Sequence, residues 1–335
     1  MARTLPFALI LSVAPSLLGG CGDPPPSPPV QEESAPTTMD TTPSGQARSH
    51  TPQGFYERSL AFVSADGDSV LIAPWSFRIR RDSQEEIRER DVRLGWLGSW
   101  EALAVDVDTG AVLGDSWRIV PGNRIRMIMG EGDALEEIFL RDPFLEMATD
   151  VGLPLARWTG SPREVARFHR GTTRLAPGED EDAVERDGFL LDLGVSSGSV
   201  EGGWQDWIFV HSGDFFQGAF LQRAEPEGTE GDVAMNTFEG WTRFAVRERR
   251  WPSVEVEWTE VRSFEDARRD IPVAWKLRTA EGEMEILLEA ESSHLSTGEG
   301  DGAVLPVDAF FQLRGELRME GDTVPLLGVI RHRQP

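Results

Sequence analysis

Apolar and charged residues alternate along the chain from Val254 to Ile330. Val254, Val256 and Trp258 fall on one face of an extended segment, and polar residues fall on the other. The alternation returns in three further segments and a last apolar strand, at 273–278, 283–290, 313–320 and 324–330. A period of two predicts antiparallel strands with one buried and one wet face. Short turns between them predict a meander that closes into a barrel or packs as a sandwich.

The first half of the chain carries a similar pattern. Residues 75–80 and 103–108 alternate between apolar and polar side chains, and Gly, Asn and Asp stand where hairpin turns need them. Helical patterns are few and short, and we expect them at 83–90, 142–151 and 161–168. The sequence therefore predicts an all-β protein with a few short helices.

A second set of strands begins at Phe189, after an acidic, loop-like stretch. We place a domain boundary there, which divides the chain into an N-terminal β domain over 53–190 and a C-terminal β domain over 191–335. The chain from about Phe55 to Pro335 is long enough for one large or two ordinary domains. The two halves are alike in architecture, but they show no repeat that aligns residue by residue.

The N-terminus has the features of a secretory signal. Arg3 precedes an apolar run over 5–18, which is too short to span a bilayer as a permanent helix. The run ends in Leu18-Gly19-Gly20-Cys21, which looks like a bacterial lipobox. That resemblance assigns 1–21 to a lipoprotein signal, with cleavage before Cys21 and a lipid on its sulfur. The alternative is a thiol buried in a core strand. Cys21 is the only cysteine, so the chain forms no intramolecular disulfide.

Residues 22–52 are rich in Pro, Ser and Thr. Such a segment buries too little apolar surface to offset its ordering entropy, so we expect a disordered tether. Its proline-rich start is expected to be extended and to lift the domains off a membrane; a Pro-rich ligand for a partner domain is the alternative. Gly22 follows the lipobox cysteine, which favours the outer membrane. We therefore expect a protein of the bacterial cell envelope, on the periplasmic face of the outer membrane or at the cell surface.

The chain is strongly acidic. Its net charge is −24, with 57 acidic residues and a single lysine, Lys276. Such a surface repels nucleic-acid phosphates and anionic lipid headgroups. We therefore expect no nucleic-acid partner, and we expect membrane attachment through lipid. The acidic run at 179–182 could attract Ca²⁺, but it lacks the spaced ligands and central glycine of a calcium loop, which favours a solvated loop.

The C-terminal half resembles a known family. Trp258, a loop, and then Ile271-Pro272-Val273-Ala274-Trp275-Lys276-Leu277 resemble the core motif of the AttH and carotenoid 1,2-hydratase (hydroxyneurosporene synthase) family. The clear match covers 249–330. The resemblance implies two lipocalin-like β-barrels, and it implies a hydratase acting on an isoprenoid-like substrate. Family members carry a carboxylate motif near the penultimate strand, where this chain has Ala309-Phe310-Phe311-Gln312, and a tyrosine where it has Ile271.

Hydration of an isolated double bond needs a carboxylic acid that stays protonated near neutral pH. Burial among aromatic groups raises the pKa of a carboxyl. Asp206 stands between Trp204 and Trp207, so it is the candidate acid, and His211 is the candidate proton relay. The alternative is that Asp206 caps a turn and His211 begins one.

Eleven tryptophans are available to line a pocket for a flat apolar ligand. Seven of them fall on predicted strands or strand ends and are candidate ligand-binding residues: Trp96, Trp100, Trp204, Trp207, Trp241, Trp258 and Trp275. The alternative is ordinary core packing. The histidines show no paired metal spacing, and no phosphate-binding or dinucleotide-binding motif is present, so we expect neither a metal nor a cofactor.

These patterns predict a monomeric, membrane-anchored lipoprotein with a lipocalin-like fold that binds or handles a lipophilic small molecule. The first alternative is a hydratase or isomerase acting on an isoprenoid-like substrate. The second alternative is a non-enzymatic scaffold of the cell envelope.

Overall fold

In the computed structural model, Ser49–Pro335 forms one compact unit. The structure describes residues 54–65, 67, 69–81, 85–111, 122, 124–130, 134–159, 164–177, 182–197, 204–223, 237–280, 282–298, 302–319 and 321–334, all within this unit. The predicted signal, Cys21 and the tether lie outside the described residues. No helix among the described residues is long and apolar enough to cross a membrane.

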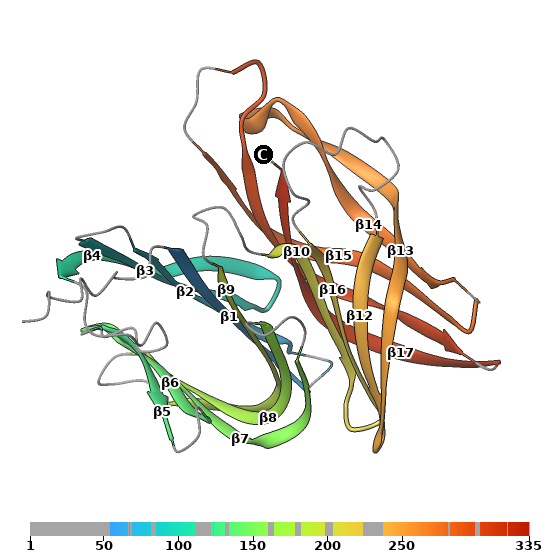
Figure 1. Cartoon of the computed structure of the whole chain (residues 1–335), viewed down its shortest axis with the longest axis horizontal. Helices are drawn as coiled ribbons and strands as arrows, with labels where there is room; N and C mark the ends of the chain where they lie inside the picture. The colour runs from blue at the N-terminus through green and yellow to red at the C-terminus, as the bar shows by residue number, and fades with distance from the viewer. Residues whose placement is uncertain are drawn as a thin grey trace, which may run out of the picture. The chain divides into compact units, whose positions relative to one another are not determined.

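The first half of the described chain forms one antiparallel sheet of nine strands (Figure 1, blue to green). Along the chain these are β1 Gly54–Ser64, β2 Leu71–Arg81, β3 Glu85–Trp96, β4 Ser99–Ala111, β5 Ile125–Met129, β6 Leu135–Arg141, β7 Leu145–Thr159, β8 Glu164–Pro177 and β9 Val184–Ser197. Their order in the sheet is β4-β3-β2-β1-β9-β8-β7-β6-β5. The first and last strands are therefore neighbours at the centre, joined by pairs such as Phe55 with Ser197.

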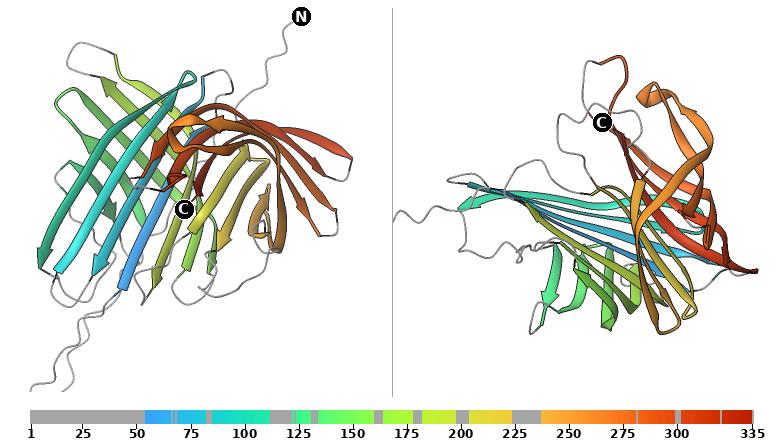
Figure 2. Two further views of the ribbon diagram at one scale, coloured as in Figure 1. Left: turned by 90° about the horizontal axis from the view of Figure 1, so that it is seen from above. Right: turned by 45° about the vertical axis from the view of Figure 1, so that its right-hand side comes forward.

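The second half forms a closed eight-stranded barrel (Figure 2, yellow to red). Its strands are β10 Trp204–Ser212, β11 Phe216–Arg223, β12 Thr237–Phe244, β13 Arg247–Phe264, β14 Arg269–Thr279, β15 Met284–Thr297, β16 Val307–Met319 and β17 Asp322–Gln334. Each strand pairs with the next, and β17 returns to β10 with Trp207 opposite Arg331. One turn of 3₁₀ helix, η2 Glu265–Ala267, joins β13 to β14.

Three apolar clusters hold these sheets together. One fills the barrel and includes Trp275 and Phe311. A second joins residues of the first sheet, such as Ala61, to residues of the barrel, such as Phe209. A third covers the opposite face of the first sheet and includes Trp75. Because side chains alternate along a strand, the first sheet can face the barrel with one set of residues and its own core with the other.

The all-β prediction, with lipocalin-like barrels or barrel-like sheets, is confirmed, but the three predicted helices are wrong. Segment 83–90 lies largely in β3, 142–151 in β7, and 161–168 in β8. In β7 the buried residues Met147 and Thr149 alternate with more exposed neighbours, which suits a strand with one covered face. Pairing of β7 with β6 and β8 outweighs the weak local helix signals.

The change from the first sheet to the barrel comes after β9, between Ser197 and Trp204. The sequence boundary at 190 falls inside β9 instead. No local pattern reveals that β9 pairs with β1 across more than a hundred residues, so its place in the first sheet is invisible to alternation alone.

Candidate functional site

The ends of β15, β16 and β17 bring polar and apolar groups together at one end of the barrel. Ser296 stands opposite Asp308, and Asp308 stands opposite Arg333, so these residues form one row across three strands. The next row, on the other face, consists of Thr297, Val307 and Gln334. With Gly298 and Pro306, the two rows line a cavity of about 400 Å³.

A buried carboxylate–imidazole pair lies one step further along the inward face of β17. His332 Nδ1 is 2.5 Å from Asp206 Oδ2, and the backbone N–H of Arg333 donates to Asp206 Oδ1 at 2.7 Å. His332 is 2% exposed and Asp206 is 5% exposed. Because Asp206 engages Nδ1, Nε2 is the ring nitrogen left to contact a ligand. That Nε2 is buried and has no hydrogen-bond partner among the described residues.

Trp258 packs against this pair. Its ring meets the His332 ring edge-on, with centroids 5.4 Å apart. The pairing of β13 with β14 shifts register directly after Trp258, and such bulges redirect side chains next to functional sites. Trp258 is 41% exposed, so it contacts both the imidazole ring and solvent.

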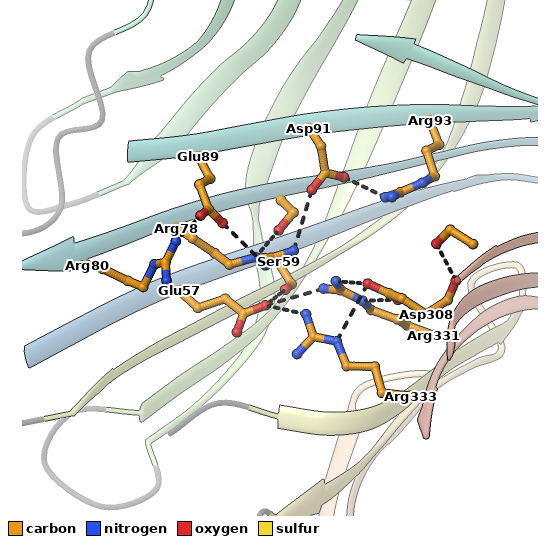
Figure 3. Close-up of polar contacts among 12 residues, drawn as sticks. Glu57, Ser59, Arg78, Arg80, Glu89, Asp91, Arg93, Asp308, Arg331 and Arg333 are labelled. Atoms are coloured by element: carbon orange, nitrogen blue, oxygen red, sulfur yellow. Dashed lines mark hydrogen bonds and ion pairs between the residues drawn. The ribbon is translucent and has the colours of Figure 1, made fainter. Parts of the chain in front are cut away.

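A charged cluster lies on the outward face of the same strands (Figure 3). Arg331 is 1% exposed and donates to both oxygens of Asp308, at 2.9 and 2.6 Å. It also donates to Glu57 Oε1 of β1 at 3.3 Å. Arg333 lies 3.4 Å from Glu57 and 3.8 Å from Asp308. Two cations and two carboxylates therefore tie the barrel to the first sheet.

The opposite charges in this cluster stabilise each other's ionised forms. Burial alone would raise the pKa of Asp308, but the charge and hydrogen bonds of Arg331 outweigh burial and hold the pKa well below its usual range. Burial likewise disfavours a charged Arg331, but Asp308 and Glu57 raise its pKa. Both groups therefore remain ionised at neutral pH, although water is largely excluded from them.

The cluster continues along β2 and β3 (Figure 3). Arg78 contacts Glu89 at 3.5 Å and Asp91 at 3.6 Å, and Arg93 contacts Asp91 at 2.5 Å. The guanidinium carbon of Arg93 lies 4.8 Å from the ring centre of Phe310. The family resemblance implies a carboxylate near this position; this chain has Phe310 there, and its ring packs against Arg93 and Arg331.

A second buried ion cluster lies on the far face of the first sheet. Arg58 donates to both oxygens of Asp192 at 2.8 Å, and Arg167 donates to Oδ2 at 2.9 Å. Burial opposes the charge of Asp192, but Arg58 and Arg167 lower its pKa to about 2. His169 Nδ1 donates to the backbone oxygen of Gly152 at 2.9 Å. Two arginines therefore contact one buried carboxylate inside the core of the first sheet.

The structure does not bring Asp206 and His211 together. Asp206 points into the barrel toward His332, whereas the His211 ring packs against Phe189 and Phe209 in the layer between barrel and first sheet. His211 Nδ1 accepts the N–H of Gly213 at 3.2 Å. Burial lowers the pKa of His211 to about 4, so the ring is neutral near pH 7. A relay between the two residues therefore finds no geometric support.

The candidate tryptophans are divided among different places. Trp207 and Trp241 belong to the layer between the sheets, and Trp100 packs against that layer and donates to Ser292 Oγ at 2.9 Å. Trp275 belongs to the barrel core, while Trp258 covers His332. Trp96 packs against the opposite face of the first sheet. The side chain of Trp204 lies outside the described residues.

Sequence reasoning missed His332, Arg331, Arg333 and Asp308 as members of a site. Alternation along 326–332 does predict that His332 faces inward, as Leu326 and Ile330 do. Its partner Asp206 is 126 positions away in sequence, however, and only barrel closure brings them together. No group of His, Cys, Asp and Glu suited to holding a metal ion occurs among the described residues.

No protein-family model and no curated protein matches this sequence. Solved structures do match: a proposed AttH from Nitrosomonas europaea has a TM-score of 0.58, with 10% identity over 88% of this chain and 98% of that chain. The chain has the fold of an AttH-like protein. Kievitone hydratase from Nectria haematococca has a TM-score of 0.52 and 11% identity, covering 86% of this chain and 92% of its own. CghA, in a structure with Sch210972, has a TM-score of 0.53 and 12% identity; the match covers 84% of this chain and 88% of that chain.

This AttH-like fold confirms the resemblance at the level of architecture. The clear sequence match covered only 249–330, whereas the structural matches extend over both halves of the chain. At 10–12% identity they establish the fold alone.

Proposed function

We propose that this protein is an envelope lipoprotein whose AttH-like barrel binds a lipophilic small molecule at the β15–β17 end. The observation that carries this proposal is the cavity of about 400 Å³ at that end. Small-molecule sites typically measure about 300–1,000 Å³ and combine apolar walls with a few polar groups. Val307 and Pro306 supply apolar wall here, and Asp308 and Arg333 supply charge.

A cavity-filling substitution tests this proposal. Thr297 lines the cavity and its side chain is exposed, so Thr297→Trp is expected to occupy the space without disturbing the core. The matched control is Val246→Trp, at an exposed turn far from the cavity residues in sequence. Binding is measured by quenching of tryptophan fluorescence and by a rise in Tm with a fatty acid or a polyene. We expect Thr297→Trp to lose binding and Val246→Trp to keep it; equal binding by both would contradict this site.

Anchoring through Cys21 is the second part of the proposal. Its support is the lipobox-like Leu18-Gly19-Gly20-Cys21, followed by a proline-rich tether over 22–52. The net charge of −24 offers no basic patch for anionic membranes, so attached lipid chains supply the affinity. The protein then acts as a monomer on the periplasmic face of the outer membrane or at the cell surface.

A specific observation also favours an enzyme, a hydratase or isomerase acting on an isoprenoid-like substrate. Asp206 orients His332, whose Nε2 has no hydrogen-bond partner in the part of the chain that the structure describes; this is the arrangement of an imidazole acid–base catalyst. Hydration of an isolated double bond delivers one proton to carbon and then removes one from the attacking water. In this proposal the protonated His332 ring delivers the first proton from Nε2, and the resulting neutral ring takes the second proton back at the same nitrogen. Trp258 covers the ring, so a substrate reaches Nε2 once this side chain moves aside.

Isoprenoid alkenes incubated with the protein in heavy water report this chemistry as deuterium incorporation. We expect Asp206→Asn and His332→Gln to abolish incorporation while ligand binding persists. Binding without any incorporation in the unaltered protein would favour the binder over the enzyme. If the folded protein neither binds lipophiles nor exchanges protons, an envelope scaffold is the remaining function.

A further inference from the structure

Arg333 places a positive charge on the wall of the cavity at the β15–β17 end. It lines the cavity and is 25% exposed, whereas its neighbour in the cluster, Arg331, is almost completely buried. The two arginines thus occupy different environments two residues apart on β17.

The arginines also contact their carboxylates differently. Arg331 holds both oxygens of Asp308 at 2.9 and 2.6 Å, in the two-pronged geometry of a strong ion pair. Arg333 approaches Asp308 at 3.8 Å and Glu57 at 3.4 Å. A guanidinium has five N–H donors in one plane, so it can serve carboxylates of its own chain and a ligand at once.

The surroundings of Arg333 stabilise its positive charge only in part, although Glu57 and Asp308 lie near it. Burial and the positive charge of Arg331 lower the pKa of Arg333, which means that its cationic form is incompletely stabilised. An anion at the cavity would stabilise that form. The acidic surface, with a net charge of −24, repels multiply charged ligands at a distance, which favours a single negative charge.

We propose that the ligand of this cavity is a lipophilic monocarboxylate, such as a fatty acid, whose carboxylate binds Arg333 while its chain lies along Pro306 and Val307. The inference rests on the proposed function, since it names the ligand class for the same site. A carboxylate matches the planar fork of arginine, and the apolar walls match an alkyl chain.

Three ligands of equal chain length test this inference on the purified full-length protein: decanoate, decanol and methyl decanoate. Dissociation constants are measured calorimetrically near pH 8, where the acid is ionised. Because a hydrogen bond to a charged group is worth more than one between neutral groups, decanoate is expected to bind about tenfold more tightly than either neutral ligand. Arg333→Gln is expected to remove this preference and leave decanol binding within a few-fold.

Arg333→Lys keeps the charge and is expected to retain part of the preference. The control is Arg318→Gln, an exposed arginine also on the barrel, which is expected to leave the preference unchanged. Equal affinity of the unaltered protein for decanoate and decanol would overturn the carboxylate inference while the proposed binding function stands. If the folded protein binds none of the three ligands, the binding function itself fails.

Discussion

Arg331 offers the sharpest test of how the first sheet and the barrel are held together. Replacing it with methionine keeps much of its length and removes its charge. The carboxylates of Asp308 and Glu57 then lose the cation that contacts them at 2.6–3.3 Å in a buried setting. Breaking a buried ion pair on one side typically costs about 3–5 kcal/mol. This is a large part of the roughly 5–15 kcal/mol that stabilises a domain.

The assay is urea unfolding followed by tryptophan fluorescence, with the free energy of unfolding extrapolated to water. The control is Arg318→Met, whose side chain is 51% exposed and pairs with Glu285, so its loss is expected to stay below about 1 kcal/mol. In the double variant Arg331→Met with Asp308→Leu, the carboxylate that lost its cation is also removed, so part of the lost stability is expected to return. Similar losses for Arg331→Met and Arg318→Met, or simple addition in the double variant, would refute the reasoning.

Three further predictions follow from the same structure. Trp275→Ala leaves a cavity in the barrel core and is expected to lower the free energy of unfolding by about 3–5 kcal/mol. Lys276→Ala, on the outward face, is expected to lower it by less than about 1 kcal/mol in the same unfolding assay. Equal losses would mean that the register of β14 is wrong. The pKa of His211 is about 4 in the folded protein and 6.5 ordinarily, so between these pH values the unfolded chain binds more protons than the folded one. The free energy of unfolding is therefore expected to fall by about 3 kcal/mol as the pH drops from 6.5 to 4. His211→Gln is expected to flatten that dependence, and an unchanged pH profile would contradict the assignment. Cys21→Ser is expected to abolish lipid labelling and release the protein from membranes, and unchanged labelling would rule out the anchor.

The strands that sequence predicted well are those with a wet outer face. Alternation placed Trp275 inward and Lys276 outward, and β14 has this register. The pattern is clear there because one face of each barrel strand meets the core and the other meets solvent. In β7 and β8 the local signal resembled a helix start, and pairing with distant strands decided the outcome.

The candidate site was predictable only in part. Asp206 stood out from its aromatic neighbours, and it is indeed buried. Its partner could not be read from the sequence, because His332 reaches it through closure of β17 onto β10. Arg331 and Glu57 are 274 positions apart in the sequence, so no local pattern predicts their contact. Long-range pairing in a barrel thus builds the site from residues that look unrelated along the chain.

If a lipophile occupies the cavity at the β15–β17 end, a photoreactive fatty acid should label the residues that line it. After irradiation of the full-length protein, mass spectrometry locates the labelled peptides. We expect saturable labelling within 296–308 or near Arg333, displaced by unlabelled fatty acid and reduced by Thr297→Trp. Labelling that concentrates on the first sheet, or that unlabelled ligand fails to displace, would show that the lipophile does not bind in this cavity.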